Sequence, residues 1–123
     1  MFFVDWFTGA TANTDENFAR VANVLAPDFV LISPRGDIHD RDDILSLIRK
    51  AHDSREAGSF KIWVEEFGAR FVEGPFCLAT YCEWQDVAGD KTCRKSTVLF
   101  RTYGGAPNHV QWVHLHETWL PAG

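Results

Sequence analysis

The sequence predicts an α+β fold, in which helices come first and a sheet of long antiparallel strands follows. Two observations carry this prediction. Before Gly58, apolar residues recur at spacings of three and four, which is typical of helices with one buried face. From Phe60 onward, β-branched and aromatic residues run in long stretches that are interrupted only by short turns containing glycine or proline. We therefore expect helices gathered on one face of an antiparallel meander.

The helical part is expected in three pieces. Two lie between Asp5 and Ala26 and are interrupted at residues 11–15, where Thr14 or Asp15 can cap the second piece. The third begins at Asp40 or Asp42 and is amphipathic up to Gly58, which stops it. Between the second and third pieces we expect a short strand at residues 29–33, a turn at residues 34–37 and a return strand at residues 38–39.

Four long strands are expected in the second half, at residues 60–72, 76–87, 92–103 and 109–120. The last of them organises the sheet, because neither of its faces is simply polar: Trp112, His114 and His116 alternate with Leu115 and Glu117. A strand with apolar or functional side chains on both faces belongs in the interior of a sheet.

Turn positions predict the pairing of these strands. A two-residue turn at Gly89-Asp90 places Trp84 opposite Lys95, and a loop at residues 104–108 places Lys95 opposite Glu117. One face then collects Leu78, Thr80, Cys82, Trp84, Lys95, Thr97, Leu99, Val113, Leu115 and Glu117, and the other collects Ala79, Tyr81, Glu83, Arg94, Ser96, Val98, Phe100, Trp112, His114 and His116. An error of one residue in either loop would exchange the faces.

Composition narrows the class of protein. We expect residues 1–123 to form one domain, since this length suits a single hydrophobic core. The net charge of −5 and the absence of a basic stripe argue against nucleic acid or a membrane surface as a partner. No membrane-length apolar segment or signal peptide is expected, which favours a cytoplasmic protein, and no cofactor is expected. Three cysteines without C-x-x-C spacing argue against a disulfide framework and a cysteine-ligated zinc site.

Four stretches give the chain a family resemblance: residues 24–30, which lead into Ser33-Pro34, the helix start at residues 41–44, and the ending at residues 113–118. With these motifs the chain resembles the nuclear transport factor 2-like superfamily, which includes SnoaL-like cyclases, steroid isomerases and the association domain of calcium/calmodulin-dependent kinase. The resemblance implies a cone-shaped, curved sheet around a central pocket plugged by the helices, with Thr97 and Glu117 on the pocket face. It also implies a dimer through the outer face of the sheet.

The chain differs from the steroid isomerases of this superfamily at two positions that matter for activity. Steroid isomerases carry an aspartate base directly before the proline that matches Pro34, where this chain has Ser33, and a second aspartate at the position that resembles Thr97. A serine does not replace a carboxylate base without a partner that removes its proton. Steroid isomerisation by that mechanism is therefore not expected.

A ligand pocket is the first candidate site. Its polar and apolar lining is predicted from the pairing and the resemblance to consist of Ser33, Thr80, Cys82, Trp84, Lys95, Thr97, Leu99, Val113, Leu115 and Glu117. The many aromatic residues favour an apolar pocket with few polar groups and a small apolar or amphipathic ligand. Glu117 is the candidate catalytic residue. If its pair with Lys95 is desolvated, Glu117 could act as a general base, whereas at the pocket rim the pair is an ordinary salt bridge.

The second candidate site is a homodimer interface on the outer face, since helices cover only one face of the sheet. Its predicted residues are Tyr81, Val98, Phe100, Trp112, His114 and His116, and a polar cluster of Arg94, Glu83 and Ser96 would lie beside them. The His114-x-His116 spacing could also place two imidazoles on a metal, but no third ligand is expected nearby, and we predict no metal site.

Three functions remain open at this point. The first is a dimeric domain that binds a small molecule of unknown identity. The second is a non-catalytic assembly module, and the third is a SnoaL-like cyclase or isomerase with Glu117 or a histidine as its base. The residues do not decide whether the protein is an enzyme.

Overall fold

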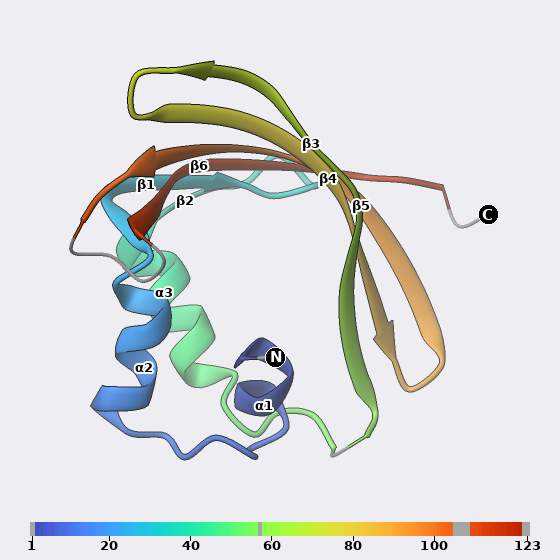
Figure 1. Cartoon of the computed structure of the whole chain (residues 1–123). Coiled ribbons are helices and arrows are strands. Elements are labelled where there is room, and N and C mark those ends of the chain that lie inside the picture. Colours follow the sequence, from blue (N-terminus) through green and yellow to red (C-terminus); the bar gives the residue numbers. More distant parts are fainter. Residues whose placement is uncertain (1, 57, 105–108, 122–123) are drawn as a thin grey trace.

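The computed structural model describes residues 2–56, 58–104 and 109–121, with the side chains of residues 2 and 4 left aside. The helices are α1 (Phe2–Phe7), α2 (Asp15–Ala22) and α3 (Arg41–Lys50). The strands are β1 (Leu25–Ile32), β2 (Ile38–Asp40), β3 (Phe60–Glu73), β4 (Phe76–Val87), β5 (Asp90–Thr102) and β6 (Val110–Trp119). They form one curved sheet in the order β2-β1-β6-β5-β4-β3, and the helices lie beneath its concave side (Figure 1). The predicted α+β class and its curved, cone-shaped sheet are confirmed.

Capping groups define where the helices begin. Thr14 Oγ1 accepts a hydrogen bond from the backbone N–H of Asn17 at the start of α2. At α3, Asp40 and Asp43 form a reciprocal capping box, with Asp43 N donating to Asp40 Oδ1 at 2.8 Å. Of the two predicted caps for the third helix, Asp40 is therefore the one used.

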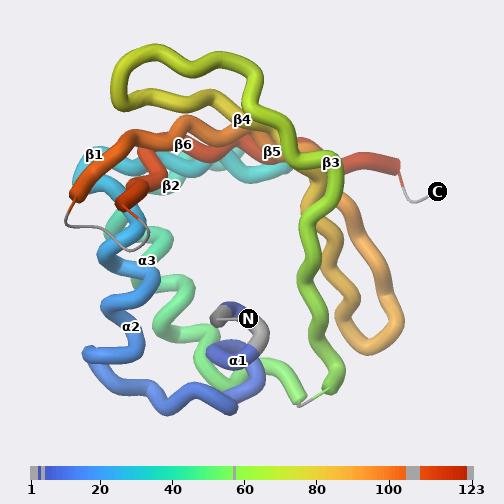
Figure 2. Tube along the Cα trace, in the orientation of Figure 1, coloured from blue at the N-terminus to red at the C-terminus, as the bar shows by residue number. Residues whose placement is uncertain are grey.

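Long-range hydrogen bonds fix the helices to the rest of the chain. The Trp6 indole is fully buried, and its Nε1 donates to the carbonyl of Ile48 at 2.7 Å. Arg41 donates to the carbonyls of Ala22 and Leu25 at 2.7 and 3.2 Å, which ties the start of α3 to the α2–β1 connection. The Trp6 bond holds α1 against α3, and both helices lie beneath the curved sheet (Figure 2).

The core lies between the concave face of the sheet and the helices. Its buried members are Leu25, Phe29, Ala79, Tyr81, Val98 and Leu115, and they come from β1, β4, β5 and β6. Tyr81 and Val98 are therefore interior residues, although they were predicted on the outer face.

The first strand begins earlier than expected. Leu25 already pairs with Trp112 of β6, in the only parallel pairing among the described strands, and Pro27 lies inside β1. The pairing register shifts between Leu25 and Val30, which is where a residue without a backbone N–H can be accommodated. The sequence pattern assigned this segment to a helix end because Pro27-Asp28 is a strong breaker signal.

Two local features change the predicted register of the long strands. The β4–β5 turn is Ala88-Gly89, so Trp84 pairs with Cys93 instead of Lys95. The pairing shifts by two residues, so the side chains of β4 and β5 that were predicted to share a face of the sheet still share it. In the β5–β6 pair, Leu99 faces His114 while Phe100 faces Trp112, so Val113 is an extra residue that exchanges the faces of β6 beyond it. Lys95 consequently pairs with Thr118, and Ser96 pairs with Glu117.

Candidate functional site

A cavity of about 420 Å³ lies between the helices and the concave face of the sheet. Helices and β1 supply its apolar wall, which includes Phe3, Phe7, Leu31, Ile44, Ile48 and, from β3, Ile62. The opposite wall is supplied by β4, β5 and β6 and carries Tyr81, Glu83, Gln85, Arg94, Trp112, Leu115 and Glu117. One side of the cavity is thus apolar and the other holds most of its polar groups.

The polar wall is organised around Arg94. Its Nη1 donates to both carboxylate oxygens of Glu117 at 3.3 and 3.4 Å, and its Nε lies 3.7 Å from a Glu83 carboxylate oxygen. Gln85 Nε2 donates to the same Glu83 oxygen at 2.9 Å. The guanidinium also lies over the Trp119 ring, 4.6 Å from its centroid. We call Glu83, Gln85, Arg94 and Glu117 the polar cluster.

Burial sets the protonation properties of this cluster. Only 7% of the Glu117 side-chain surface is exposed, and 17% of that of Arg94. Desolvation raises the pKa of the Glu117 carboxyl, an effect that the guanidinium of Arg94 opposes. Desolvation also raises the pKa of the Tyr81 phenol, and the Glu83 carboxylate adds to that rise. Within the described residues, Arg94 Nε is buried without a hydrogen-bond partner.

Most of the predicted pocket residues lie elsewhere. Only Leu115 and Glu117 of the ten line this cavity. Ser33 stabilises the turn before β2, where its Oγ accepts from the backbone N–H groups of Arg35 and Asp37. Six of the others lie on the outer face of the sheet: Thr80, Cys82, Trp84, Lys95, Thr97 and Leu99. Val113 is the extra residue at the irregularity in β6.

The predicted Lys95–Glu117 pair is wrong, because the two residues lie on opposite faces. Lys95 instead lies in an outer-face group with Cys82 and Glu66. The Cys82 thiol donates to Glu66 at 3.0 Å, and Lys95 Nζ donates to the Cys82 sulfur at 3.5 Å. The bond to Glu66, together with burial, raises the pKa of the Cys82 thiol, so this group favours the neutral thiol.

The residues predicted for the dimer interface are divided between the two faces. Tyr81 and Val98 are core residues, and Trp112 lines the cavity, where it packs edge-to-face on Phe100 with ring centroids 5.0 Å apart. His114 and His116 do lie on the outer face, opposite Leu99 and Thr97. The extra residue at Val113 places Trp112 and the two histidines on opposite faces of β6.

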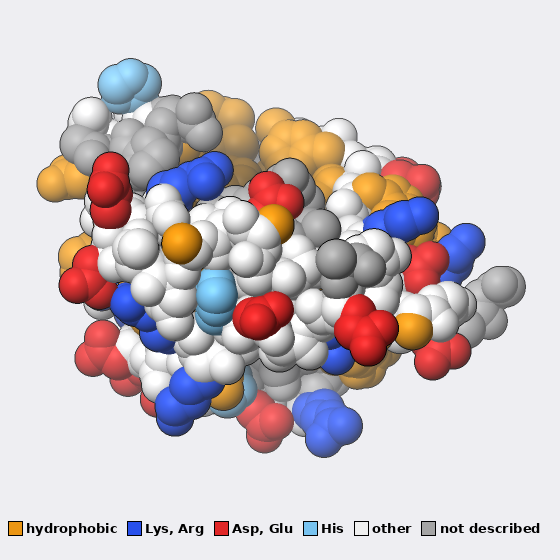
Figure 3. Space-filling model, turned by 90° about the horizontal axis from the view of Figure 1, so that it is seen from below, with side chains coloured by type: hydrophobic (Ala, Val, Ile, Leu, Met, Phe, Trp, Pro, Cys, Tyr) orange, Lys and Arg blue, Asp and Glu red, His pale blue; other side chains and the backbone are white. Residues whose placement is uncertain are grey.

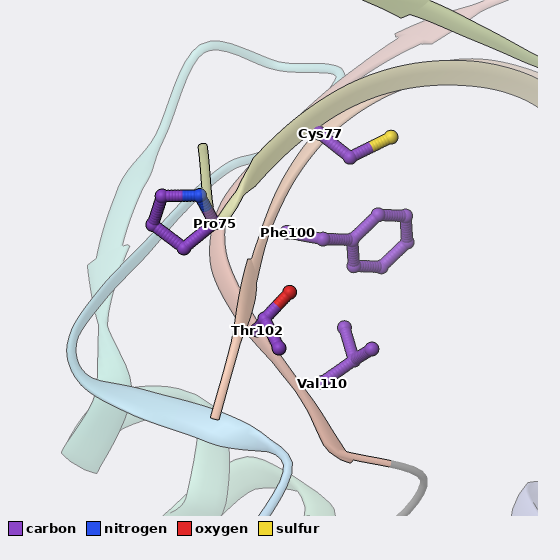
Figure 4. Close-up of a pocket in the computed structure, with 5 residues that line it drawn as sticks. All are labelled: Pro75, Cys77, Phe100, Thr102 and Val110. Carbon is purple, nitrogen blue, oxygen red and sulfur yellow. The ribbon is translucent and has the colours of Figure 1, made fainter. Parts of the chain in front are cut away.

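A second hollow, of about 280 Å³, lies near the ends of β4, β5 and β6. It is lined by Pro75, Cys77, Phe100, Thr102 and Val110, and Cys77, Phe100 and Val110 project to the same side of the strands (Figure 4). Among the described residues, no charged side chain lines it. This hollow therefore offers little beyond an apolar surface.

Charge is mixed on the face of the molecule that lies below the helices. Acidic and basic side chains are interspersed over the face seen from below the helices (Figure 3). Across residues 2–56, 58–104 and 109–121, no three histidine, cysteine, aspartate or glutamate residues gather as a possible metal site. No described helix is both long and apolar enough to cross a membrane.

Within the polar cluster, the sequence did not place Arg94, Glu83 and Gln85 in the cavity. Arg94 and Glu83 were expected to form a polar cluster, but on the outer face, and Gln85 was not singled out. The available signal was the charge pattern of β4 and β5. Glu83 faces Arg94 across the observed Ala88-Gly89 turn, and the predicted turn also places these two residues on one face of the sheet.

The fold is shared with solved structures. An NTF2-like protein of unknown function from Pseudomonas aeruginosa superposes with a TM-score of 0.84 at 22% identity, over 97% of this chain and 90% of that one. A CaMKII hub from S. rosetta superposes with a TM-score of 0.68 at 13% identity, over 89% of this chain and 84% of that one. The predicted superfamily is thereby confirmed at the level of fold, and some of these neighbours are association domains.

Sequence comparison narrows the family. The family model for the sucrose-6-phosphate phosphohydrolase C-terminal region matches residues 1–121. Sucrose-phosphatase 1 of Nicotiana tabacum is 25% identical over 121 residues, which cover 98% of this chain and 28% of the relative. The chain thus spans little more than a quarter of the curated relatives it matches. This match corrects the predicted function, because the family is described as the C-terminal region of sucrose-6-phosphate phosphohydrolase, and the prediction named an apolar-ligand domain, an assembly module or a SnoaL-like enzyme instead. The chain belongs to the sucrose-6-phosphate phosphohydrolase C-terminal family.

Proposed function

We propose that this chain works as the C-terminal domain of a sucrose-6-phosphate phosphohydrolase and supports the hydrolysis of sucrose 6-phosphate together with a separate catalytic region. The match of residues 1–121 to this family carries the proposal. The curated relatives named as sucrose-phosphatases are far longer than the matched segment, which covers 28% of Sucrose-phosphatase 1. The part of these relatives outside the matched segment is long enough to contain the catalytic region.

Charge in the cavity supports this division of labour. Enzymes that transfer a phosphoryl group surround it with cations that stabilise its negative charge. The polar cluster instead places two carboxylates, Glu83 and Glu117, around the single guanidinium of Arg94. With Glu117 and Glu83 ionised the cluster has a net charge of −1, and it repels a phosphate. We therefore place the hydrolysis of the phosphate ester outside this domain.

A domain exchange tests the proposal. In tobacco Sucrose-phosphatase 1, the 121-residue segment that matches this chain would be deleted or replaced by this chain. Phosphate release from sucrose 6-phosphate would then be measured for each protein. We expect the deletion to lower kcat/KM and the exchange to restore it, because this chain supplies the same domain.

The matched control is an exchange with the NTF2-like protein from Pseudomonas aeruginosa, which shares the fold. A role specific to this family requires that this control fail to restore kcat/KM. The proposal is contradicted if the deletion keeps the full kcat/KM, or if both exchanges behave alike.

We also propose that residues 1–123 form one cytoplasmic domain that pairs with a second copy through the outer face of the sheet. Helices cover only the concave face, and the outer face carries the stacked Trp63 and Trp84 rings, with centroids 6.0 Å apart. His114 and His116 lie on the same face. Light scattering should give the mass of a dimer at neutral pH, and Trp84→Arg should halve it. A monomeric wild-type chain would contradict the pairing.

A further inference from the structure

We propose that the polar cluster binds a neutral, hydroxyl-rich sugar of one or two rings in the concave cavity, with the ring resting against the apolar wall. The volume of about 420 Å³ falls within the range of roughly 300–1,000 Å³ that is usual for small-molecule sites. This inference rests on the proposed function for the choice of a sugar among neutral polyols. It goes beyond that function, because it assigns a binding site to the domain itself.

The electrostatics of the cluster exclude charged ligands. An anion would approach two carboxylates and one guanidinium, which together repel it. A cation would compete with Arg94, which already lies 3.3 Å from Glu117 and 3.7 Å from Glu83. Since the guanidinium is always protonated in proteins, it holds that position at every physiological pH. The site therefore favours a ligand without net charge.

The hydrogen-bonding capacity of the cluster excludes a purely apolar ligand. Part of the Glu83 and Arg94 side chains is exposed, 21% and 17% respectively, and both line the cavity. Covering these groups with a hydrocarbon would remove water from them without replacing its hydrogen bonds, which is costly. A sugar hydroxyl both donates and accepts, so it can donate to the Glu83 carboxylate and accept from the Gln85 amide or the Arg94 guanidinium.

The opposite wall suits the remaining surface of a sugar. The C–H groups of a sugar ring gain dispersion contacts against apolar side chains. Leu31, Ile44 and Ile62 form such a wall, and the Trp112 indole lines the cavity on the sheet side. The cavity thus pairs a hydrogen-bonding side with an apolar side, as a sugar ring requires.

Titration of the full 123-residue chain with sucrose tests this inference. Backbone amide NMR shifts should map to β4, β5 and the helices around the cavity, with a dissociation constant on the order of 1 mM. Sucrose 6-phosphate should bind more weakly than sucrose, because its phosphate meets the net negative cluster. Glu83→Gln should weaken sucrose binding about fivefold to tenfold, since a charged acceptor becomes neutral.

Glu65→Gln is the matched control, because Glu65 is exposed on the neighbouring strand and pairs with Cys82 of the outer face. It should leave sucrose binding unchanged. The inference is overturned if sucrose causes no shifts, if the shifts map to the outer face, if Glu83→Gln binds like the wild type, or if sucrose 6-phosphate binds more tightly. Binding without restored phosphatase activity in the domain exchange would overturn the proposed function alone, and restored activity without binding would overturn only the sugar site.

Discussion

Replacing Arg94 by methionine should destabilise the fold strongly, because it leaves a buried carboxylate without its cation. Glu117 is 6% exposed, and both of its oxygens accept hydrogen bonds from Arg94. Removing one partner of a buried ion pair costs about 3–5 kcal/mol. The contact of the guanidinium with the Trp119 ring, at 4.6 Å, adds about 0.5–1 kcal/mol. Since part of the cluster faces an open cavity, we expect the lower end, about 3 kcal/mol.

Urea unfolding followed by circular dichroism measures this loss at neutral pH. For a chain of this size, a loss of about 3 kcal/mol corresponds to a fall in Tm of roughly 10–15 °C. The matched control is the double variant Arg94→Met/Glu117→Leu, which removes both charges. It should regain at least half of the lost unfolding free energy, because an apolar pair replaces a buried ion pair at little cost.

Two outcomes would refute the reasoning. A loss under about 1 kcal/mol for Arg94→Met would mean that the pair behaves like an exposed salt bridge. A double variant that is less stable than Arg94→Met would mean that Glu117 is stabilised without Arg94. Either result would remove the electrostatic basis of the polar cluster.

The pH dependence follows from the raised pKa of Glu117. The folded chain binds the proton at a higher pH than the unfolded chain, so the unfolding free energy contributed by this group rises as the pH falls from neutrality toward 4.5, the ordinary value. In Arg94→Met the opposing guanidinium is absent, and the rise should be larger. The stability gap between this variant and the wild type should therefore narrow on acidification. A gap that is constant between neutral pH and about 5 would contradict this assignment.

Three further variants, two of them with a matched control, test the fold by urea unfolding. Trp6→Ala should cost about 3–5 kcal/mol because the indole is fully buried and bonded to Ile48, whereas Phe71→Ala, at an exposed site, should change stability by less than about 0.5 kcal/mol. Asp40→Ala should cost about 1 kcal/mol through loss of the α3 capping box, and Asp42→Ala much less; equal losses would count against the cap. Ala88→Gly should raise the unfolding free energy by about 0.5–1 kcal/mol, because Ala88 has a φ of 52°, a backbone conformation that is strained for alanine and not for glycine. A variant less stable than the wild type would contradict the presence of this strain.

The elements could be predicted because their signals are local. Alternation between turns defines the four long strands, whose bounds differ from the structure by at most two residues. Apolar periodicity defines the start of α3, but the helix ends at Lys50 and does not extend to Gly58 as predicted. The start of β1 could not be predicted in this way. Its pairing with β6 joins Leu25 to Trp112, residues far apart in the chain, and this tertiary contact overrides the breaker signal of Pro27.

The faces of the sheet were harder to predict than its strands. A single extra residue at Val113 decides which side chains of β6 meet the helices, and no sequence pattern at this position marks it. Glu117 lines the cavity, but its expected neighbours Thr97 and Lys95 do not. The face predicted by analogy for β4 and β5 was the opposite one, so the pairing of Glu117 with residues of these strands was predicted wrongly.

This inversion matters chemically because it replaces Lys95 by Arg94 as the partner of Glu117. A buried lysine can lose its proton and leave the carboxylate unpaired, whereas a guanidinium remains charged and donates from several nitrogens in one plane. Arg94 can therefore contact Glu117, approach Glu83 and stack on the Trp119 ring at the same time. The Arg94 guanidinium keeps its proton at neutral pH, so Arg94 does not act as an acid or a base. Such a guanidinium suits recognition of a neutral ligand better than acid–base catalysis, and this is the property on which the proposed sugar site depends.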